Sequence, residues 1–486
     1  MKSMMKFFLI AVALAVLSLD GCTDSAPNGP VPSLGSNTIK KYVSVGNSLT
    51  AGYQSNGLYQ SAQVYSYPNL IAQQLIKAGA ALGSFEQPYY SDPGTPDPST
   101  GKASRYEIIS LVGPVIGPKG LAPGAPTNSA LPRPYDNLGI PGIPLAGFMD
   151  TTGTYQSAPL GRDAILRWTS GPFPKSVYKQ VVALQPDLVT FWLGANDVLG
   201  YATSGGVSPS APTPAATFAA LYNQALNSLR QSLPNAKIVV ANIPDVRAIP
   251  FFTTVGPVLG AQIASLGLKL AYQKKGEIGP GTGQSSLSPT EAGAPLLTLK
   301  GITYAALVGR PTGQWYRDNR YPALPAGIDT TKPFGLDPRN PWPDALTLDA
   351  DEQATAAAAI TSFNATIASI AGANNAAVVD FYSFFNSVAQ NGYSLAGEEY
   401  TTEYISGALF SLDGVHPTSR GYGIIANEYI KVLNAKFGMN IPLVDISQLP
   451  GIPAPLGKIS SQNSLPYIPP GAFRGMELLF ERPTSQ

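Results

Sequence analysis

One serine and one histidine have the residue types and positions that nucleophilic catalysis needs. Ser48 follows the apolar run YVSVGN, which predicts a strand that ends in a turn. A serine hydroxyl attacks an acyl carbon only when a neighbouring base takes its proton, and histidine is the usual base near neutral pH. His416 is the only histidine among the 486 residues. Ser48 and His416 are therefore the candidate nucleophile and base.

An acidic residue lies close to this histidine in the sequence. The motif SLDGVHPTSRGYG places Asp413 three residues before His416. An Asp-x-x-His turn can hold the carboxylate against one imidazole nitrogen while the other nitrogen faces the serine. Pro417 restricts the backbone after the base, and Thr418 is a suitable N-cap for a following helix. We therefore expect Ser48, His416 and Asp413 to form a triad.

The elements that must position these residues alternate between strands and helices. Runs rich in β-branched and aromatic residues predict strands over 41–48, 187–197, 236–244 and 376–385, with a weaker one over 106–113. Apolar periodicity predicts helices over 213–234, 349–372 and roughly 418–437. Near-continuous apolar strands between helices indicate a parallel sheet covered on both faces.

Helix signals and strand ends refine this prediction. Thr213 before Pro214 predicts an N-cap, and Asp349 with Glu352 has capping-box spacing. Ligands of an open parallel sheet bind at the carboxyl ends of its strands. The strong apolar part of one predicted strand, 187–193, ends in the sequence GAND, which contains Asn196. Polar groups from several strands should therefore meet at one edge.

Four short motifs resemble, in order, the sequence blocks of the SGNH (GDSL-type) hydrolases. They are GNSL, NLGIPG, GAND and DGVHPT, and they span residues 42–420. The resemblance implies a three-layer, flavodoxin-like α/β fold with a parallel central sheet flanked by helices. It also implies a serine esterase or lipase that works without a cofactor. Large loop insertions would distinguish this chain from a minimal member.

The resemblance assigns roles to five residues. Ser48 would be the nucleophile, with Asp413 and His416 completing the triad. The backbone N–H of Gly139 and the side-chain amide of Asn196 would form the oxyanion hole. Position 47 is Asn where the family name implies Asp. An Asn can still accept backbone hydrogen bonds in the turn, so we expect the same geometry without the charge.

Composition excludes several other classes of function. The chain has 31 basic and 30 acidic residues, a balance that offers no basic field for nucleic acid. One histidine and one cysteine cannot build the usual zinc sites, and no carboxylate spacing suggests calcium. No P-loop is present. The aromatic pairs at 89–90 and 191–192 are expected to be packing residues.

The first residues predict export and a lipid anchor. Residues 1–21 contain two lysines and then an apolar run over 7–19, which is typical of a secretory signal and short for a transmembrane span. The only cysteine, Cys22, follows in LDGC, which resembles the bacterial lipoprotein signal and implies acylation there. Several acyl chains would anchor the protein stably, and Thr23 is compatible with the outer membrane. An ordinary signal with an incidental cysteine is the alternative.

The rest of the chain is interpreted as one domain. Small, polar, Pro- and Gly-rich residues predict a flexible tether over 22–38. The hydrolase domain would cover 39–440, with insertions at about 83–135 and 246–345. Residues 441–486 are Pro-rich and are expected to be extended and packed on this domain.

The substrate stays open at this stage. A small-molecule or lipid ester would suit a membrane-tethered esterase or lipase, and an O-acetylated polysaccharide would suit an exported deacetylase. Outside the enzymes, the alternative is a non-catalytic surface lipoprotein that binds a glycan or lipid. The sequence does not give the oligomeric state or the membrane face.

Overall fold

A five-stranded sheet forms the centre of the protein, whose computed structural model describes residues 31–111, 114–152, 176–207, 211–395, 397–451 and 465–480. Its strands are β1 (Tyr42–Gly46), β4 (Asn137–Gly139), β5 (Leu188–Trp192), β6 (Lys237–Ala241) and β11 (Ala377–Val379). They lie in the order β11-β6-β5-β1-β4, and every neighbouring pair is parallel. The predicted parallel sheet is confirmed.

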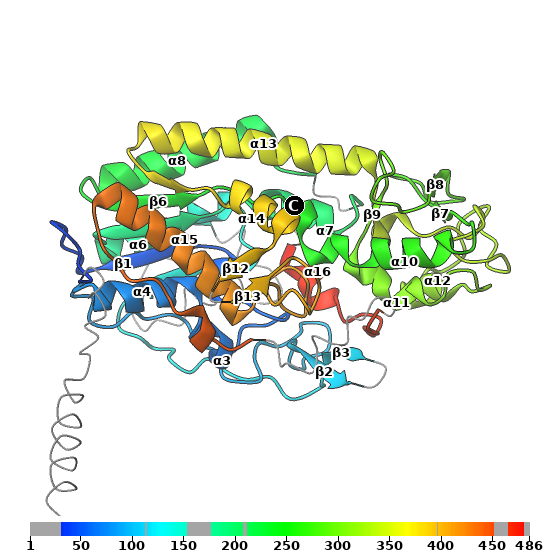
Figure 1. Cartoon of the computed structure of the whole chain (residues 1–486), viewed down its shortest axis with the longest axis horizontal. Coiled ribbons are helices and arrows are strands. Elements are labelled where there is room, and N and C mark those ends of the chain that lie inside the picture. The colour runs from blue at the N-terminus through cyan, green and yellow to red at the C-terminus, as the bar shows by residue number, and fades with distance from the viewer. Residues whose placement is uncertain are drawn as a thin grey trace, which may run out of the picture.

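Helices cover both faces of this sheet (Figure 1). One face packs against α4 (Tyr67–Lys77), α14 (Phe381–Asn391) and α15 (Ser419–Phe437). The other face packs against α6 (Val177–Leu184), α8 (Ala215–Ser232) and α13 (Ala350–Ala373). The two apolar clusters between these layers are the core, so the three-layer α/β prediction is confirmed.

The predicted helices α8, α13 and α15 are present, and two of their three predicted N-caps are confirmed. Asp349 and Glu352 form a reciprocal capping box on α13, and the Thr418 hydroxyl accepts from the Gly421 N–H at the start of α15. Thr213 does not cap α8, because its hydroxyl donates to Asp197 Oδ1 at 2.6 Å.

One strand prediction is partly wrong. Residues 376–385 were expected to be one strand, but β11 ends at Val379 and α14 begins at Phe381. Asp380 causes the switch, because its carboxylate accepts from the Ser383 N–H and caps the helix. The aromatic residues that follow therefore lie on a helix face rather than on a strand.

The helix α13 is, within the described part of the chain, the one helix long and apolar enough by length and composition to cross a membrane. In this protein it packs along α8, where the rings of Phe363 and Phe218 stack 3.9 Å apart. Its apolar stripe is therefore used inside the domain.

The first insertion adds a small hairpin. Its strands β2 (Tyr106–Ser110) and β3 (Val115–Pro118) pair antiparallel and form a sheet of their own. The weaker strand expected over 106–113 therefore exists, but it is not part of the central sheet. Before this hairpin lie the short helices α2 (Ser48–Ala51) and α3 (Gln60–Gln63).

The second insertion is a folded lobe at one end of the sheet, at the right of Figure 1. It contains η3 (Val246–Ala248), α9 (Pro250–Thr253), α10 (Val255–Ala264), β7 (Leu270–Tyr272), β8 (Gly283–Ser285), β9 (Leu296–Leu297), η4 (Leu299–Gly301), α11 (Ile302–Ala305), α12 (Gln314–Asp318) and η5 (Asp344–Leu346). The short β10 (Thr347–Leu348) pairs with β9 and leads into α13. Buried Phe251, Leu259 and Trp342 of this lobe belong to the same apolar cluster as β5 and α8.

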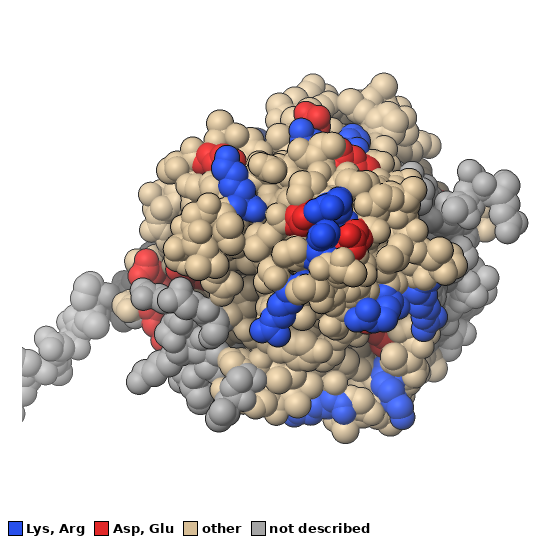
Figure 2. Space-filling view, turned by 90° about the vertical axis from the view of Figure 1, so that its right-hand side faces the viewer, with Lys and Arg blue, Asp and Glu red and all other residues tan. Residues whose placement is uncertain are grey.

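The outer end of this lobe is mostly uncharged, with a basic excess. Residues 250–343 contain nine Lys and Arg against five Asp and Glu. Figure 2 looks onto this end and shows Lys and Arg side chains in blue, with fewer Asp and Glu side chains in red, scattered over a largely tan surface. Leu266 and Ile278 also lie in this lobe, and each is about 70% exposed.

Both ends of the described chain are fixed to the domain. Ser33, within the predicted tether, exchanges two backbone hydrogen bonds with Asn440. Residues 441–449, including η6 (Ile446–Gln448), bury Ile441 and Ile446 against α15. The last described element, α16 (Arg474–Phe480), packs on α7 (Asn196–Thr203). The extension is therefore not extended throughout.

Two buried carboxyl groups meet where the second insertion joins α13. Asp344 is 4% exposed and Glu352 is fully buried, and each has one carboxylate oxygen without a hydrogen-bond partner in the described part of the chain. Burial raises the pKa of Asp344 to about 7, with added repulsion from Asp349 and Glu277, and burial raises the pKa of Glu352 to about 8, with added repulsion from Asp344. Asp349 also repels the Glu352 carboxylate, and the charge of Lys275 lowers both pKa values in part.

Candidate active site

Ser48 lies at the carboxyl end of β1, which pairs with β5 and β4 in the central sheet. Asn47 caps α2 by accepting from the Leu49 N–H at 3.0 Å, as expected for this position, and Ser48 is the first residue of that helix. Gly46 allows the tight turn, because a Cβ there would lie 2.0 Å from Thr50 Oγ1. The strand-to-helix turn therefore holds the serine hydroxyl at the carboxyl ends of the parallel strands.

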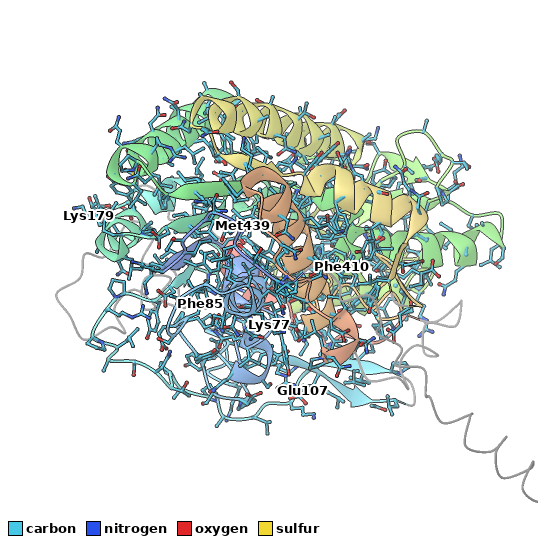
Figure 3. The ribbon with its side chains drawn as sticks, turned by 60° about the vertical axis from the view of Figure 1, so that its left-hand side comes forward. Lys77, Phe85, Glu107, Lys179, Phe410 and Met439 are labelled. Carbon is cyan, nitrogen blue, oxygen red and sulfur yellow. The ribbon has the colours of Figure 1, made fainter. Side chains whose placement is uncertain are left out.

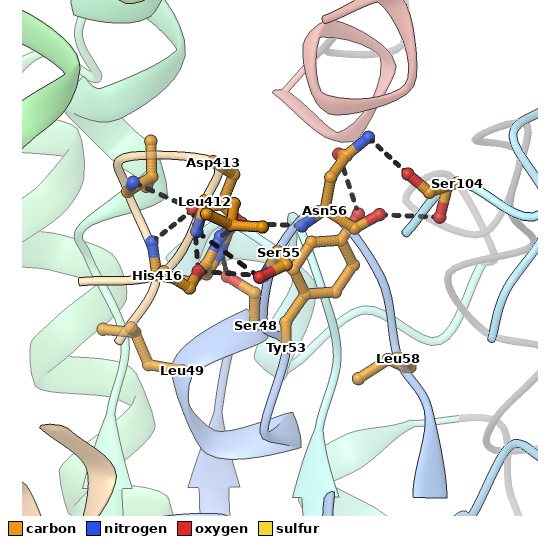
Figure 4. A network of polar contacts seen from close by, with 12 residues as sticks. Ser48, Leu49, Tyr53, Ser55, Asn56, Leu58, Ser104, Leu412, Asp413 and His416 are labelled. Carbon is orange, nitrogen blue, oxygen red and sulfur yellow. Dashed lines mark hydrogen bonds and ion pairs between the residues drawn. The ribbon is translucent and has the colours of Figure 1, made fainter. Parts of the chain in front are cut away.

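Ser48, His416 and Asp413 are brought into hydrogen-bonding contact (Figure 4). Ser48 Oγ lies 2.9 Å from His416 Nε2, and His416 Nδ1 lies 2.9 Å from Asp413 Oδ2. All three side chains are at most 2% exposed. The arrangement lets one imidazole nitrogen take the serine proton while the carboxylate holds the other.

Asp413 is held in its charged form by hydrogen bonds as well as by the histidine. Burial alone would raise the pKa of this carboxyl group, but His416 and backbone N–H groups lower it below its ordinary value. Asp413 Oδ1 accepts from the N–H groups of Val415 and His416 at 2.9 and 2.8 Å. Asp413 Oδ2 accepts a further N–H from Asn56 at 2.8 Å.

That last donor belongs to a tight turn that sequence reasoning missed. Ser55 and Asn56 both have positive φ, 49° and 63°, which is uncommon for residues other than glycine. Asn56 is anchored by Ser104, whose hydroxyl donates to the Asn56 carbonyl at 2.6 Å and whose carbonyl accepts from Asn56 Nδ2 at 3.2 Å. Figure 4 shows this network reaching from the triad into the first insertion. The sequence QSNG does signal a turn, but not its contact with Asp413.

Asn196 lies at the start of α7, beside the triad. Its Nδ2 donates one hydrogen to the Ile143 carbonyl at 3.0 Å, and no acceptor in the described part of the chain takes the second. The adjacent Asp197 accepts the Leu145 N–H at 2.8 Å. These two contacts hold the segment after β4 next to Asn196.

Gly139, the second predicted oxyanion donor, is placed differently from the expectation. It lies within β4, and its N–H donates to Asn137 Oδ1 at 2.9 Å, so this N–H is occupied. Gly142, in the same motif, lies in the following turn at φ 77°, and its N–H has no acceptor in the described residues. Gly142 directly precedes Ile143, which contacts Asn196. The geometry therefore favours Gly142 over Gly139 as a backbone donor.

A cavity of about 700 Å³, counted out to its open mouth, lies beside Ser48 and His416. Its wall is almost wholly apolar and includes Trp192, Leu199, Val246, Phe385, Phe410 and Ile425. Trp192 was expected to be only a packing residue, and it is both, since its ring also stacks on Phe381 at 4.5 Å. Phe410, labelled in Figure 3, packs against Phe385 of α14.

Within the described residues, no group of three or more His, Cys, Asp or Glu side chains could hold a metal ion. Cys22, the predicted lipid-attachment residue, lies outside the described residues.

A family model described as GDSL-like Lipase/Acylhydrolase matches residues 42–278 and 314–429, well over half of the chain. The chain belongs to this family. It is accordingly a hydrolase that acts on ester bonds, with the α/β fold of the SGNH hydrolases. No curated protein matches this GDSL-family hydrolase.

Several solved structures are similar to this GDSL-family chain at low identity. A lipase/acylhydrolase from Enterococcus faecalis is 12% identical, with coverage of 83% of this chain and 100% of the other and a TM-score of 0.30. A family 3 carbohydrate esterase from Clostridium thermocellum is 13% identical, with coverage of 83% and 98% and a TM-score of 0.31. An extracellular lipase from Streptomyces rimosus is 14% identical, with coverage of 82% and 99% and a TM-score of 0.30.

Proposed function

We propose that this protein is an exported, lipid-anchored serine hydrolase that cleaves carboxylic esters through an acyl-enzyme on Ser48. The observation that carries the catalytic assignment is the pair of 2.9 Å contacts that link Ser48 to His416 and His416 to Asp413. Such a linked hydroxyl, imidazole and carboxylate is the arrangement that activates a serine nucleophile.

In the acylation step, Ser48 Oγ attacks the ester carbonyl carbon and His416 Nε2 takes the hydroxyl proton. Asp413 stabilises the imidazolium that forms. The tetrahedral intermediate collapses, the bond to the alcohol oxygen breaks, and His416 returns the proton to the leaving alcohol. Water then attacks the acyl-enzyme with the same proton transfers, which releases the carboxylic acid and restores Ser48.

The negative oxygen of the intermediate needs donors on the opposite side from the histidine. Ser48 is the first residue of α2, so its N–H has no intrahelical acceptor and is available. The free N–H of Asn196 Nδ2 and the Gly142 N–H are the other donors that we assign. Removal of one such donor typically costs about 3 kcal/mol of transition-state stabilisation.

Labelling with a fluorophosphonate tests the catalytic assignment. The wild-type protein should form an adduct on Ser48 and hydrolyse a p-nitrophenyl ester, whereas folded Ser48→Ala should do neither. A wild-type protein that folds but neither reacts nor turns over ester would favour the alternative of a non-catalytic lipoprotein that binds a glycan or lipid.

The proposed anchor rests on the sequence around Cys22. Metabolic labelling with an alkyne-tagged fatty acid in a bacterium with two membranes should label the wild-type protein and leave Cys22→Ala unlabelled. The wild-type protein should also fractionate with the outer membrane, and Cys22→Ala should become soluble in the periplasm. Equal labelling of both proteins would contradict the assignment of Cys22.

A further inference from the structure

The cavity beside Ser48 contains information about the substrate that the triad alone does not give. Apolar side chains from β5, α7, η3, α14 and α15 line it, so its apolar wall extends beyond the reach of the two carbons of an acetyl group. Its wall combines buried side chains from two layers of the fold, namely Trp192 of β5 in the sheet with Phe385 of α14 and Ile425 of α15 in the helical layer on one face. Such a wall offers apolar burial and no hydrogen bonds.

Besides the proposed reacting groups, the polar side chains that line this cavity are Asn47, Asp245 and Thr402, and the first two already have partners. Asn47 caps α2, and Asp245 accepts from Arg247 Nε and Nη2 at 2.9 and 2.7 Å. Ser48, His416 and Asn196 are the proposed reacting groups. A sugar ring would therefore have to bury hydroxyl groups with little to bind them, which costs free energy.

We propose that the cavity binds the aliphatic acyl chain of a medium-length fatty acyl ester and thereby sets a preference for such esters over acetyl esters. This inference rests on the proposed function, because it takes Ser48 as the acylated residue. It identifies the acyl part of the substrate, and it disfavours the alternative that the protein is an O-acetyl-polysaccharide deacetylase.

The acyl chain fits this cavity better than the alcohol does for a chemical reason. The alcohol leaves after acylation, and a water molecule must then reach the same side of the acyl-enzyme. A dry apolar cavity would hinder that water. The acyl chain, by contrast, stays bound through both steps, so an apolar wall can hold it throughout.

A chain-length series on the full-length protein in detergent tests the proposal. The p-nitrophenyl esters of acetate, butanoate, octanoate and hexadecanoate keep the leaving group constant. Each methylene that is buried is worth a factor of about 3 to 4, so kcat/KM should rise by on the order of 100-fold from acetate to octanoate, with part of the chain buried. A flat series, or one highest for acetate, would overturn the proposal.

Two further substrate sets separate the alternatives. Methyl, butyl and octyl acetate vary the alcohol instead, and kcat/KM should change little along them. A rise along this series and not along the acyl series would place the alcohol in the cavity and overturn our assignment. Turnover of an acetylated xylo-oligosaccharide at or above the rate for octanoate would also overturn it.

A pair of variants ties the preference to the cavity. Ala248 lines the cavity and ends η3, so Ala248→Phe should fill it. We expect the ratio of kcat/KM for octanoate to kcat/KM for acetate to fall by about tenfold or more. The matched control is Ala264→Phe, at an exposed position that ends α10 away from the cavity, which should leave both values as in the wild type. Equal losses on both esters in Ala248→Phe would contradict the assignment.

The proposed function and this inference can fail separately. If Ser48 takes no fluorophosphonate and no ester is hydrolysed, the catalytic assignment fails. If Ser48 is labelled and acetate is hydrolysed as well as octanoate, only the acyl-chain assignment fails.

Discussion

Replacing Glu352 by Gln should make the protein more stable at alkaline pH. The carboxyl group of Glu352 is fully buried, with Asp344 and Asp349 close to it and Lys275 as the nearby cation. Its Oε2 accepts the Asp349 N–H at 2.9 Å, a contact that the Gln carbonyl oxygen can keep. The Gln side chain cannot ionise, so the variant removes the titration and preserves the shape.

The direction of this stability change follows from the raised pKa of Glu352, which is about 8 against an ordinary value of 4.5. The folded protein holds this proton more tightly than the unfolded chain does. The resulting stabilisation is fully present below pH 4.5 and is lost as pH rises towards 8. At about 1.4 kcal/mol per pKa unit, the whole loss would be roughly 4 to 5 kcal/mol. Asp344 ionises in the same pH range, and its charge raises the pKa of Glu352, so part of this loss belongs to the pair. We expect the ionisation of Glu352 itself to account for about 2 kcal/mol of the lost unfolding free energy.

Urea unfolding followed by far-UV circular dichroism at pH 5.5 and pH 8.5 measures this effect. The unfolding free energy of the wild type should fall between the two pH values by about 2 kcal/mol more than that of Glu352→Gln. Asp351→Asn, an exposed carboxylate on the same turn of α13, is the control and should behave like the wild type. Equal pH dependence in the wild type and Glu352→Gln would refute the reasoning.

Further predictions concern the triad and the groups around it. Asp413→Asn should lower kcat by about 10⁴-fold with KM nearly unchanged, because the imidazole loses its charged partner, and steady-state kinetics would show this. Ser104→Ala removes the hydroxyl that holds the Asn56 carbonyl, so kcat should fall by about tenfold while the melting temperature changes little; a change in KM alone would contradict this. Gly139→Ala should destabilise the fold by roughly 1 to 3 kcal/mol, since its Cβ would lie 2.4 Å from the Ala51 nitrogen. Thr213→Val leaves Asp197 Oδ1 without its 2.6 Å donor and should cost about 1 to 3 kcal/mol in urea unfolding.

The central sheet and the residues of the triad were predictable because their signals are local. A buried parallel strand such as β5 reads as a continuous apolar run, and the lone His416 limits the choice of base to one residue. The caps of α13 and α15 are also local, since donor and acceptor are three residues apart. Local rules fail at β11, where Asp380 starts a helix among residues that favour strands.

Other features depend on contacts between distant parts of the chain. Asn56 reaches Asp413 across 357 positions, and nothing in the sequence QSNG specifies that partner. The availability of the Gly139 and Gly142 N–H groups depends on the Asn137 side chain and on the turn after β4. The cavity is formed by residues of β5, η3, α14 and α15 together, so its size could not be read from any one of them.

The order of the triad along the chain has a consequence for biosynthesis. Ser48 is translated early, whereas Asp413 and His416 are made 365 or more positions later. A nascent polypeptide that ends before residue 416 lacks the base. After a cut between Ser48 and His416, no single fragment carries both the hydroxyl and its base. A ribosome-bound chain that ends before residue 416 is therefore unable to cleave esters by this route, and ester cleavage begins only after synthesis has passed that residue.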